Sequence, residues 1–393
     1  MIVEPKVREY ICTTAHPAGC EENVREQIAY VKAQGPKAGP KKVLVIGAST
    51  GYGLASRITA AFGCQAATLG IMFERPASGK RTATAGWYNT AAFEKFATQD
   101  GLYAKSINGD AFSAEVKKQA IDTIRRDLGQ VDLVVYSLAA PRRSADGVTY
   151  SSTLKTVGSP FTEKSIDLRT NEIVTKSVEP ATDKEIEGTI KVMGGEDWED
   201  WIKVLQKAGV LAENAKTVAY SYIGPELTYP IYTHGTIGQA KNHLQKTAEK
   251  MNQELNGVTA VVSVNKALVT QASSAIPIVP LYLSILYKIM KEQGSHEDCI
   301  RQMDRLFRTK LLENPMPVDQ EGRIRMDDWE LDEKVQAEVM KVWAMMSTEN
   351  LKEVSDIDGY WEDFYKMFGF RFEQVDYSQD VDVDVRIPSL EEN

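Results

Sequence analysis

Cysteine is scarce in this chain, and its spacing argues against two classes of protein. Four cysteines stand among 393 residues, at positions 12, 20, 64 and 299. A small disulfide-stabilised fold would need a denser set, so we predict free thiols in a reducing compartment. Cys12, His16 and Cys20 lie close enough in sequence to suggest a metal site. Because no second ligand cluster completes that site, we predict no metal.

Long apolar runs and an excess of positive charge are also missing. The most apolar stretch, residues 275–290, is shorter than the ~20 residues of a transmembrane helix and contains two prolines, so we expect a buried helix. Residues 1–10 carry four charges and no apolar core, which predicts no secretory signal. The net charge of -9 argues against a nucleic-acid partner, which would need a basic face. We therefore expect a cytoplasmic protein without a membrane span.

What the chain does contain is typical of a globular protein with a large core, since 43% of its residues are hydrophobic and 26% charged. At about 100–200 residues per domain, its length allows two domains or one large domain with insertions. We predict a single enlarged dinucleotide-binding domain over residues 1–393. In this interpretation residues 141–200 are an insertion near the substrate site, and residues 280–393 are a mostly helical C-terminal extension.

The N-terminal half alternates short apolar runs with helical patterns. The runs predict four strands, at residues 43–47, 67–74, 103–109 and 131–139. The helical patterns predict helices at 52–62, 88–99 and 116–128, the last with Ser113 as its N-cap. This alternation is typical of an α/β fold with a parallel, doubly wound sheet of the Rossmann type.

The alternation stops after residue 140, where the chain becomes polar. Residues 166–178 predict a β-hairpin, and Thr182 with Glu185 resembles a capping box. The remaining predicted elements are helices over 183–208, a fifth strand at 217–223, a helix at 236–255, a sixth strand at 259–264, and mostly helix beyond residue 280.

A glycine-rich loop follows the first predicted strand and precedes a helical pattern, the context expected of a dinucleotide-binding loop. Its spacing is G-x3-G-x-G. The first glycine allows a tight turn, the second a close approach of backbone to a pyrophosphate, and the third close packing of helix on strand. The helix N-terminus adds N–H donors and a positive dipole. The loop residues are Gly47, Ala48, Ser49, Thr50, Gly51, Tyr52 and Gly53.

Residues at the ends of the other strands are further candidates for cofactor binding. Phe73 and Glu74 end the second strand, where a carboxylate accepts hydrogen bonds from ribose hydroxyls and repels a 2′-phosphate. Arg75 next to it would attract that phosphate, but we predict NADH over NADPH. Ligands of open α/β sheets bind at the carboxyl ends of the strands. The same reasoning therefore includes Asp110, Ala111, Leu138 and Ala139.

Three tyrosines lie at the end of the fifth predicted strand and in the segment after it, and Lys241 lies nine residues after the last of them. A tyrosine is a poor acid with a pKa near 10, but a nearby ammonium favours its phenolate and lowers that pKa. Such a pair can stabilise and protonate a developing oxyanion or enolate. The spacing alone does not choose among Tyr222, Tyr229 and Tyr232. His234 and His243 are alternative acids, and we interpret His243 as structural.

Several short stretches resemble one enzyme family, the trans-2-enoyl-CoA reductases together with the V-type bacterial enoyl-acyl carrier protein reductases. This family is an enlarged relative of the short-chain dehydrogenases and reductases. The resembling stretches occur in order along nearly the whole chain, at residues 16–20, 47–53, 86–89, 136–142, 192–198, 220–225, 235–238, 264–270 and 326–329.

The resemblance implies roles for individual residues. Its Tyr-x8-Lys pair matches Tyr232 as proton donor and Lys241 as the residue that holds the cofactor ribose, with Tyr222 in contact with the substrate. It implies NADH as cofactor, enoyl-CoA or enoyl-acyl carrier protein as substrate, and a monomer. In the reaction, Tyr232 with Tyr222 nearby would stabilise an enolate. Further cofactor contacts implied are Val269, Thr270, Gln271 and Ala272.

Two other functions stay open from the sequence. A short-chain carbonyl or alcohol dehydrogenase would share the fold, although it would use a Tyr-x3-Lys pair. A sensor that binds NAD(H) without turnover would not need the Tyr–Lys pair. Two sequence features also have two interpretations each. The apolar residues 276–286 would line an acyl chain or fill the core, and Arg142 with Arg143 would meet a coenzyme A phosphate or lie in a solvated loop.

Overall fold

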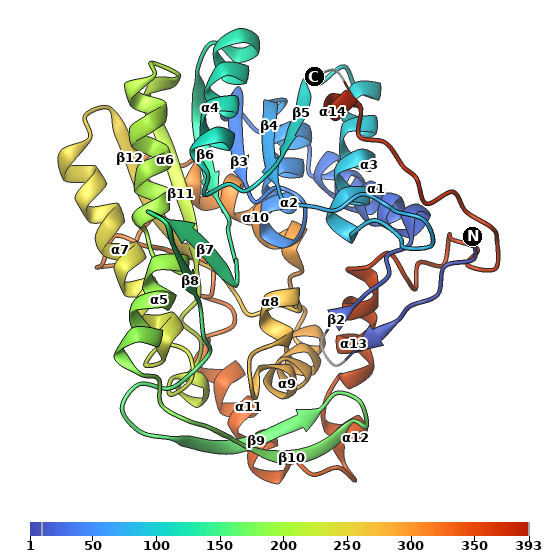
Figure 1. The fold of residues 1–393 in the computed structure, drawn as a ribbon. Helices are drawn as coiled ribbons and strands as arrows, with labels where there is room; N and C mark the ends of the chain where they lie inside the picture. The colour runs from blue at the N-terminus through green and yellow to red at the C-terminus, as the bar shows by residue number, and fades with distance from the viewer. Residues whose placement is uncertain (9–10, 392–393) are drawn as a thin grey trace.

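The structure is a computed structural model that describes residues 1–8 and 11–391, and for residue 272 the backbone only. Its central sheet has seven parallel strands in the order β13-β12-β11-β6-β3-β4-β5 (Figure 1). Six of them confirm the six predicted strands. The strands are β3 (Lys42–Ile46), β4 (Ala67–Met72), β5 (Ala104–Asn108), β6 (Val131–Tyr136), β11 (Leu211–Ser221), β12 (Val258–Val264) and β13 (Ile324–Arg325).

Helices cover both faces of this sheet, which confirms the predicted doubly wound fold. The side chains of β3 alternate between the two apolar layers: Val43 and Val45 pack into one, Leu44 and Ile46 into the other. All four are fully buried, as expected of a parallel strand covered on both faces. The first layer is formed by α1 (Pro17–Ala33), α2 (Gly51–Ile58), α3 (Ala85–Gln99) and α10 (Cys299–Leu306), and the second by α4 (Ala114–Thr123), α6 (Glu196–Lys207) and α7 (Thr236–Glu254).

The predicted helix starts are confirmed by their caps. Ser113 Oγ accepts a hydrogen bond from the N–H of Val116 at 3.2 Å. Thr182 and Glu185 form the reciprocal capping box at the start of α5 (Asp183–Met193). The π-helical turns Thr59–Gly63 and Ile124–Leu128 extend α2 and α4 to about the predicted ends.

Two hairpins lie outside the main sheet, in the polar segment after β6. The predicted one is present as β9 (Phe161–Asp167) paired with β10 (Glu172–Val178). The sequence did not predict the other, β7 (Arg142–Ala145) with β8 (Val148–Ser151), whose turn contains Asp146 and Gly147 at positive φ. β9 contacts the C-terminal helices, where Lys164 Nζ donates to the carbonyl of Trp343 at 2.9 Å. The division into domain, insertion and extension stays a prediction.

The C-terminal half adds a helical layer beyond the carboxyl ends of the strands (Figure 1). Its centre is α9 (Val279–Glu292), the predicted buried helix, against which α11 (Glu333–Met345) and α13 (Ile357–Lys366) pack. Residues 281–287 of α9 are fully buried, which agrees with the core-packing interpretation. Across residues 1–8 and 11–391, no helix is both long and apolar enough to cross a membrane.

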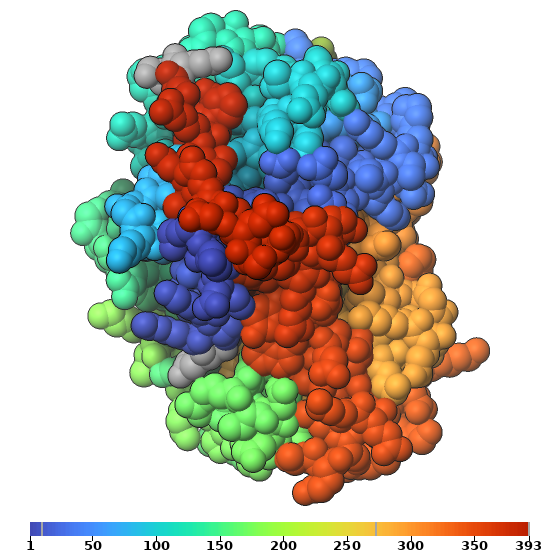
Figure 2. Space-filling model, turned by 90° about the vertical axis from the view of Figure 1, so that its right-hand side faces the viewer, coloured from blue at the N-terminus to red at the C-terminus, as the bar shows by residue number. Residues whose placement is uncertain are grey.

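The end of the chain returns to the edge of the sheet. Figure 2 shows this segment in red, crossing the surface beside the N-terminal residues in dark blue. Trp87 of α3 donates to the carbonyl of Val385 at 2.7 Å, and Ser389 Oγ donates to the buried carboxylate of Glu94 at 2.7 Å. Ser389 Oγ also accepts from the N–H of Ser106 in β5 at 2.9 Å, so the segment binds α3 to the edge strand β5.

Candidate active site

The glycine-rich loop joins β3 to α2 and has the geometry of a phosphate-binding loop. A side chain at Gly53 is excluded, because a Cβ there would lie 1.8 Å from the carbonyl oxygen of Gly47. Gly51 has a φ of 53° and no atom within 4 Å of a Cβ position, so the loop is open on this side. Thr50 caps α2 without a side-chain hydrogen bond, which leaves the first N–H groups of the helix without a side-chain cap. An anion fits there.

Glu74 follows β4 and lies beside this loop. Its carboxylate accepts hydrogen bonds from Ser49 Oγ at 2.6 Å and from Thr84 Oγ1 at 2.5 Å. Its backbone N–H and C=O are both bonded to the side chain of Asn108. Glu74 is therefore held in place, unlike Phe73, which is 78% exposed.

Asn89 of α3 is a loop-supporting residue that sequence reasoning missed, although it belongs to one of the family-like stretches. Its Nδ2 donates to the carbonyl of Ser49 at 3.1 Å, and its side chain is buried. Its Oδ1 is buried and has no hydrogen-bond partner among the described residues. The same helix begins at Ala85, where Gly86 leaves room for the Glu74 carboxylate, 2.0 Å from where a Cβ would lie.

The other predicted cofactor residues lie at the same edge of the sheet. Asp110 follows β5, and its Oδ1 accepts from the N–H of Phe112 at 3.0 Å. Ala111 is buried, and its carbonyl accepts from Trp201. Leu138 follows β6 and packs beside Gly47, while Ala139 is exposed.

The segment after β12 runs along the site into α8 (Gln271–Ser274). Val269 is buried and its N–H donates to the hydroxyl of Tyr287 at 3.0 Å. Thr270 is half-buried and its N–H donates to Ser273 Oγ at 2.9 Å, whereas Gln271 is exposed. The side chain of Ala272 lies outside the described part of the chain.

Two of the three candidate tyrosines lie together. The rings of Tyr222 and Tyr232 are 4.8 Å apart between centroids, edge to face. Tyr222 donates its hydroxyl proton to Glu330, whereas no described residue hydrogen-bonds to the hydroxyl of Tyr232. Burial raises the pKa of both phenols above the usual value. Tyr229 instead contacts the ring of His234.

Lys241 lies on the first turns of α7, which begins directly after the tyrosine segment. The carbonyl of Tyr232 accepts from the N–H groups of Gly235 and Gly238, which fixes the tyrosine to the start of that helix. Lys241 Nζ donates to the carbonyl of Tyr220 at 2.9 Å. Burial lowers the pKa of Lys241 to about 8, because a charged ammonium is disfavoured away from water.

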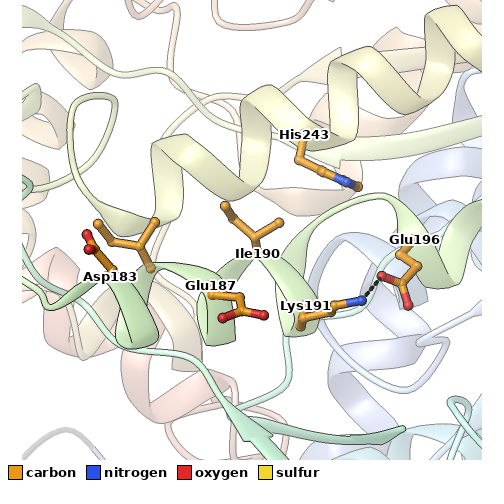
Figure 3. A pocket seen from close by; sticks show the side chains of 7 residues that line it. Asp183, Glu187, Ile190, Lys191, Glu196 and His243 are labelled. Atoms are coloured by element: carbon orange, nitrogen blue, oxygen red, sulfur yellow. Dashed lines mark hydrogen bonds and ion pairs between the residues drawn. The ribbon is translucent and has the colours of Figure 1, made fainter. Parts of the chain in front are cut away.

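His243, on the same helix, is structural. Its Nδ1 accepts from the N–H of Gly195 at 3.0 Å, immediately before α6. It also lines a hollow of about 370 Å³, shown in Figure 3, to which none of the predicted site residues contributes. The other lining residues are Asp183, Ile186, Glu187, Ile190, Lys191 and Glu196.

Two further predictions concern Arg143 and the cysteine–histidine cluster near the N-terminus. Arg143 is buried, donates to the carbonyl of Lys191 at 2.8 Å and lies over the ring of Phe112, so neither a phosphate contact nor a solvated loop describes it. His16 caps α1 by accepting from the N–H of Gly19. All four cysteines are free, as predicted, and the described residues contain no group of three or more His, Cys, Asp or Glu placed to hold a metal ion.

Family models match almost the whole chain. Residues 2–79 match a model described as the NAD(P)H binding domain of trans-2-enoyl-CoA reductase, and residues 81–312 match one described as the trans-2-enoyl-CoA reductase catalytic region. The first match includes the phosphate loop and Glu74. The second includes Tyr222, Tyr232 and Lys241.

A third model, described as an enoyl reductase FAD binding domain, matches residues 318–381. These residues include β13, α11, α12 (Leu351–Val354) and α13, and the large side chains Trp343, Tyr360 and Phe364 are buried in the core around α9. A flavin diphosphate needs a glycine-rich loop at a helix N-terminus or a comparable cradle, and residues 318–381 contain no such loop. The residues present do not fit a flavin.

Curated relatives and solved structures extend the likeness over the full length. An enoyl-[acyl-carrier-protein] reductase [NADH] of Coxiella burnetii is 58% identical over 99% of this chain and 98% of that protein. A trans-2-enoyl-CoA reductase [NADH] of Ruminiclostridium cellulolyticum is 55% identical over 99% of this chain and 100% of that protein. The crystal structure of Treponema denticola trans-2-enoyl-CoA reductase in complex with NAD, 49% identical, covers 98% of this chain and is itself covered fully, with a TM-score of 0.95. The chain belongs to the trans-2-enoyl-CoA reductase family.

Proposed function

We propose that this chain is an NADH-dependent reductase of the C2–C3 double bond of trans-2-enoyl thioesters, carried by coenzyme A or acyl carrier protein, in fatty acid synthesis. The observation that carries the proposal is the free hydroxyl of Tyr232. It lies against Tyr222, at the same carboxyl edge of the sheet as the phosphate loop. The names of the relatives support the cofactor and the substrate class.

Cofactor binding is assigned to the residues at this edge. The loop from Gly47 to Gly53 and the start of α2 would hold the pyrophosphate, and the Glu74 carboxylate would accept from the ribose hydroxyls. Phe73, Asp110, Leu138 and Val269 to Ala272, with their neighbours, would line the rest. When bound, NADH supplies the hydride that adds to C3 of the substrate.

Tyr232 is the proposed proton donor. As C3 gains a hydride, the thioester carbonyl becomes an enolate oxygen, and a hydrogen bond aimed at that oxygen stabilises the charge as it develops. The raised pKa of Tyr232 keeps its hydroxyl protonated and able to donate. Tyr232 then gives its proton to the enolate and regains one from water; the proton ends on C2, which gives the saturated acyl thioester. The Lys241 ammonium would hold the cofactor ribose.

Replacement of Tyr232 by phenylalanine tests the main proposal. NADH oxidation with crotonyl-CoA is followed by absorbance, and we expect Tyr232→Phe to lose about 100-fold or more in kcat, the range of a lost general acid. Tyr229→Phe is the matched control, because Tyr229 lies in the same segment and should keep nearly full activity. Absence of turnover by the wild-type protein with any enoyl thioester would reject the function and leave the NAD(H) sensor.

Cofactor choice is tested at Glu74. We expect Glu74→Ala to lower the preference for NADH over NADPH by about tenfold, because hydrogen bonds to a charged group and the repulsion of a 2′-phosphate are both removed. The exposed Glu115→Ala serves as the control for general charge effects. An unchanged ratio of kcat/KM values for the two cofactors would contradict the proposed role of Glu74.

The lowered pKa of Lys241 predicts the pH dependence of the reaction. The ammonium is present below about pH 8 and is lost as pH rises through that value. We therefore expect kcat/KM, which reports the free enzyme, to fall above pH 8 in the wild type. Lys241→Met should have a low activity without this alkaline decline. A wild-type profile that stays flat to high pH would contradict this assignment.

We further propose that the protein acts as a cytoplasmic monomer. Four free cysteines support a reducing compartment, and resemblance to the family supports the monomer. Light scattering on the purified protein decides the oligomeric state: a mass of two or more chains would reject the monomer.

A further inference from the structure

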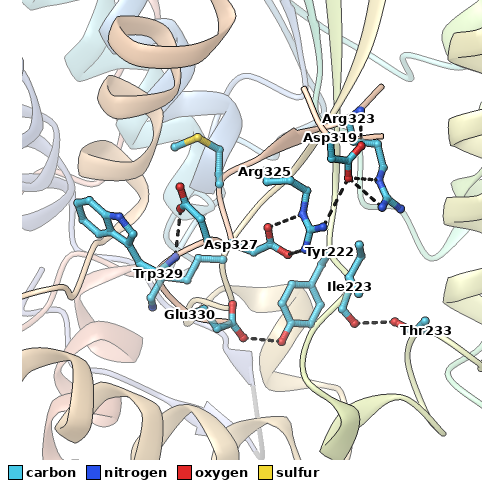
Figure 4. A network of polar contacts seen from close by, with 12 residues as sticks. Tyr222, Ile223, Thr233, Asp319, Arg323, Arg325, Asp327, Trp329 and Glu330 are labelled. Carbon is cyan, nitrogen blue, oxygen red and sulfur yellow. Dashed lines mark hydrogen bonds and ion pairs between the residues drawn. The ribbon is translucent and has the colours of Figure 1, made fainter. Parts of the chain in front are cut away.

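Glu330 is a buried carboxylate that connects the C-terminal extension to the proposed active site. It lies between β13 and α11, and its side chain is completely buried. Its Oε1 accepts from the hydroxyls of Tyr222 at 2.9 Å and Tyr282 at 2.7 Å, and its Oε2 accepts from the N–H of Ala267 at 2.7 Å. Figure 4 shows Glu330 and Tyr222 facing each other across this contact.

The three donors stabilise the ionised form of this carboxylate. An ionised carboxylate only accepts hydrogen bonds, which suits a site where two phenols and an amide all donate. Burial raises the pKa of Glu330, and the nearby Lys266 ammonium with these hydrogen bonds opposes that rise. A buried carboxylate without such partners would cost several kcal/mol, so the arrangement has to stay intact.

The contact decides what Tyr222 can do. A phenol has one proton, and Tyr222 donates it to Glu330. In this contact it has none left for the substrate oxygen, so we assign the hydrogen bond to the enolate oxygen to Tyr232 alone. Tyr222 keeps its ring, which packs against the edge of Tyr232, and a lone pair. Tyr232 remains the hydroxyl donor of the pair.

The second oxygen of Glu330 holds the segment that leads to the proposed cofactor residues. Ala267 is two residues before Val269, whose N–H donates to Tyr287, and the two N–H groups before Ala267 are also bonded to residues outside the segment. The N–H of Asn265 donates to Ser221 and that of Lys266 to Gln302 Oε1 at 2.9 Å. Loss of the Glu330 acceptor would release Ala267 in the middle of this row.

We propose that Glu330 is a positioning residue for the reductase, whose two oxygens fix the Tyr222 ring on the substrate side and the Ala267 backbone on the cofactor side. This inference rests on the proposed function. It gives residues 318–381 a role: they supply a buried carboxylate to the active site.

The test compares two isosteric amides in the same turn. Glu330→Gln removes the charge. It also replaces one acceptor oxygen by an NH2 group, which cannot accept the hydrogen bond from Ala267 or from the tyrosines. Asp327→Asn is the matched control, because Asp327 is equally buried but is bonded to Arg325 and to no site residue. We expect Glu330→Gln to lower kcat with crotonyl-CoA by about tenfold, the effect of a lost charged hydrogen bond, and Asp327→Asn to change it little.

A double-mutant cycle separates positioning from general destabilisation. If Glu330 acts through Tyr222, the loss of kcat/KM from Glu330→Gln should shrink by about threefold or more in a Tyr222→Phe background, since contacting residues are not additive. Fluorescence titration gives the Kd for NADH without turnover, and it should rise in Glu330→Gln and not in Asp327→Asn. Fully multiplicative losses, or wild-type kcat and Kd in Glu330→Gln, would overturn the proposal.

Tyr222→Phe alone keeps the proposal testable if Glu330→Gln does not fold. Because the Tyr222 hydroxyl donates its hydrogen bond to Glu330 and not to the substrate, we expect Tyr222→Phe to lose less than about tenfold in kcat, far less than Tyr232→Phe. An equal loss in the two variants would show that Tyr222 donates to the substrate and would refute the assignment. An inactive wild type would instead reject the function, while the NADH Kd values still report on Glu330.

Discussion

Burial of the parallel sheet on both faces is the constraint on which the rest of the structure depends. Its central strands have almost no exposed side chain, and polar side chains buried against the covering helices, such as Thr68, Ser106 and Thr217, are hydrogen-bonded within the fold. Chemistry is therefore restricted to the strand ends. Each strand delivers one segment to the carboxyl edge, so residues as distant as Gly51, Glu74, Tyr222 and Val269 meet there. Their order along the chain does not bring these residues together, but the parallel topology does, because it places the carboxyl ends of the strands at one edge.

The helices beyond that edge make it a place for buried charge. Burial lowers the pKa of the Lys241 and Lys266 ammonium groups to about 8 and raises that of the Glu330 carboxyl. Each of the three is held by hydrogen bonds from or to backbone, which offset part of the desolvation. An active site enclosed in this way has a low dielectric, where one directed hydrogen bond to a developing charge is worth more than in water.

Local signals were enough to predict most of the fold from the sequence. The capping box at Thr182, the phosphate loop and six strands depend on residues a few positions apart, and the structure contains them. β13 was missed because two residues carry no alternating pattern. Glu330 was missed for a different reason: it lies 108 residues from Tyr222, and only the fold brings the two together. The spacing of three tyrosines could not choose a donor, because the choice depends on these distant partners.

The structure separates the three tyrosines by the partner of each hydroxyl or ring. Tyr229 packs on His234 near the surface, the Tyr222 hydroxyl donates a hydrogen bond to Glu330, and Tyr232 has no hydrogen-bond partner for its hydroxyl among the described residues. The Tyr232 hydroxyl is not among the fully buried polar atoms of the described residues that lack a partner, so a group that enters the site can reach it. The oxygen of a thioester enolate is such a group. The open hydroxyl of Tyr232 and the rigidity that Glu330 imposes on Tyr222 are then two parts of one arrangement, in which the C-terminal part of the chain holds one phenol still so that its neighbour can donate.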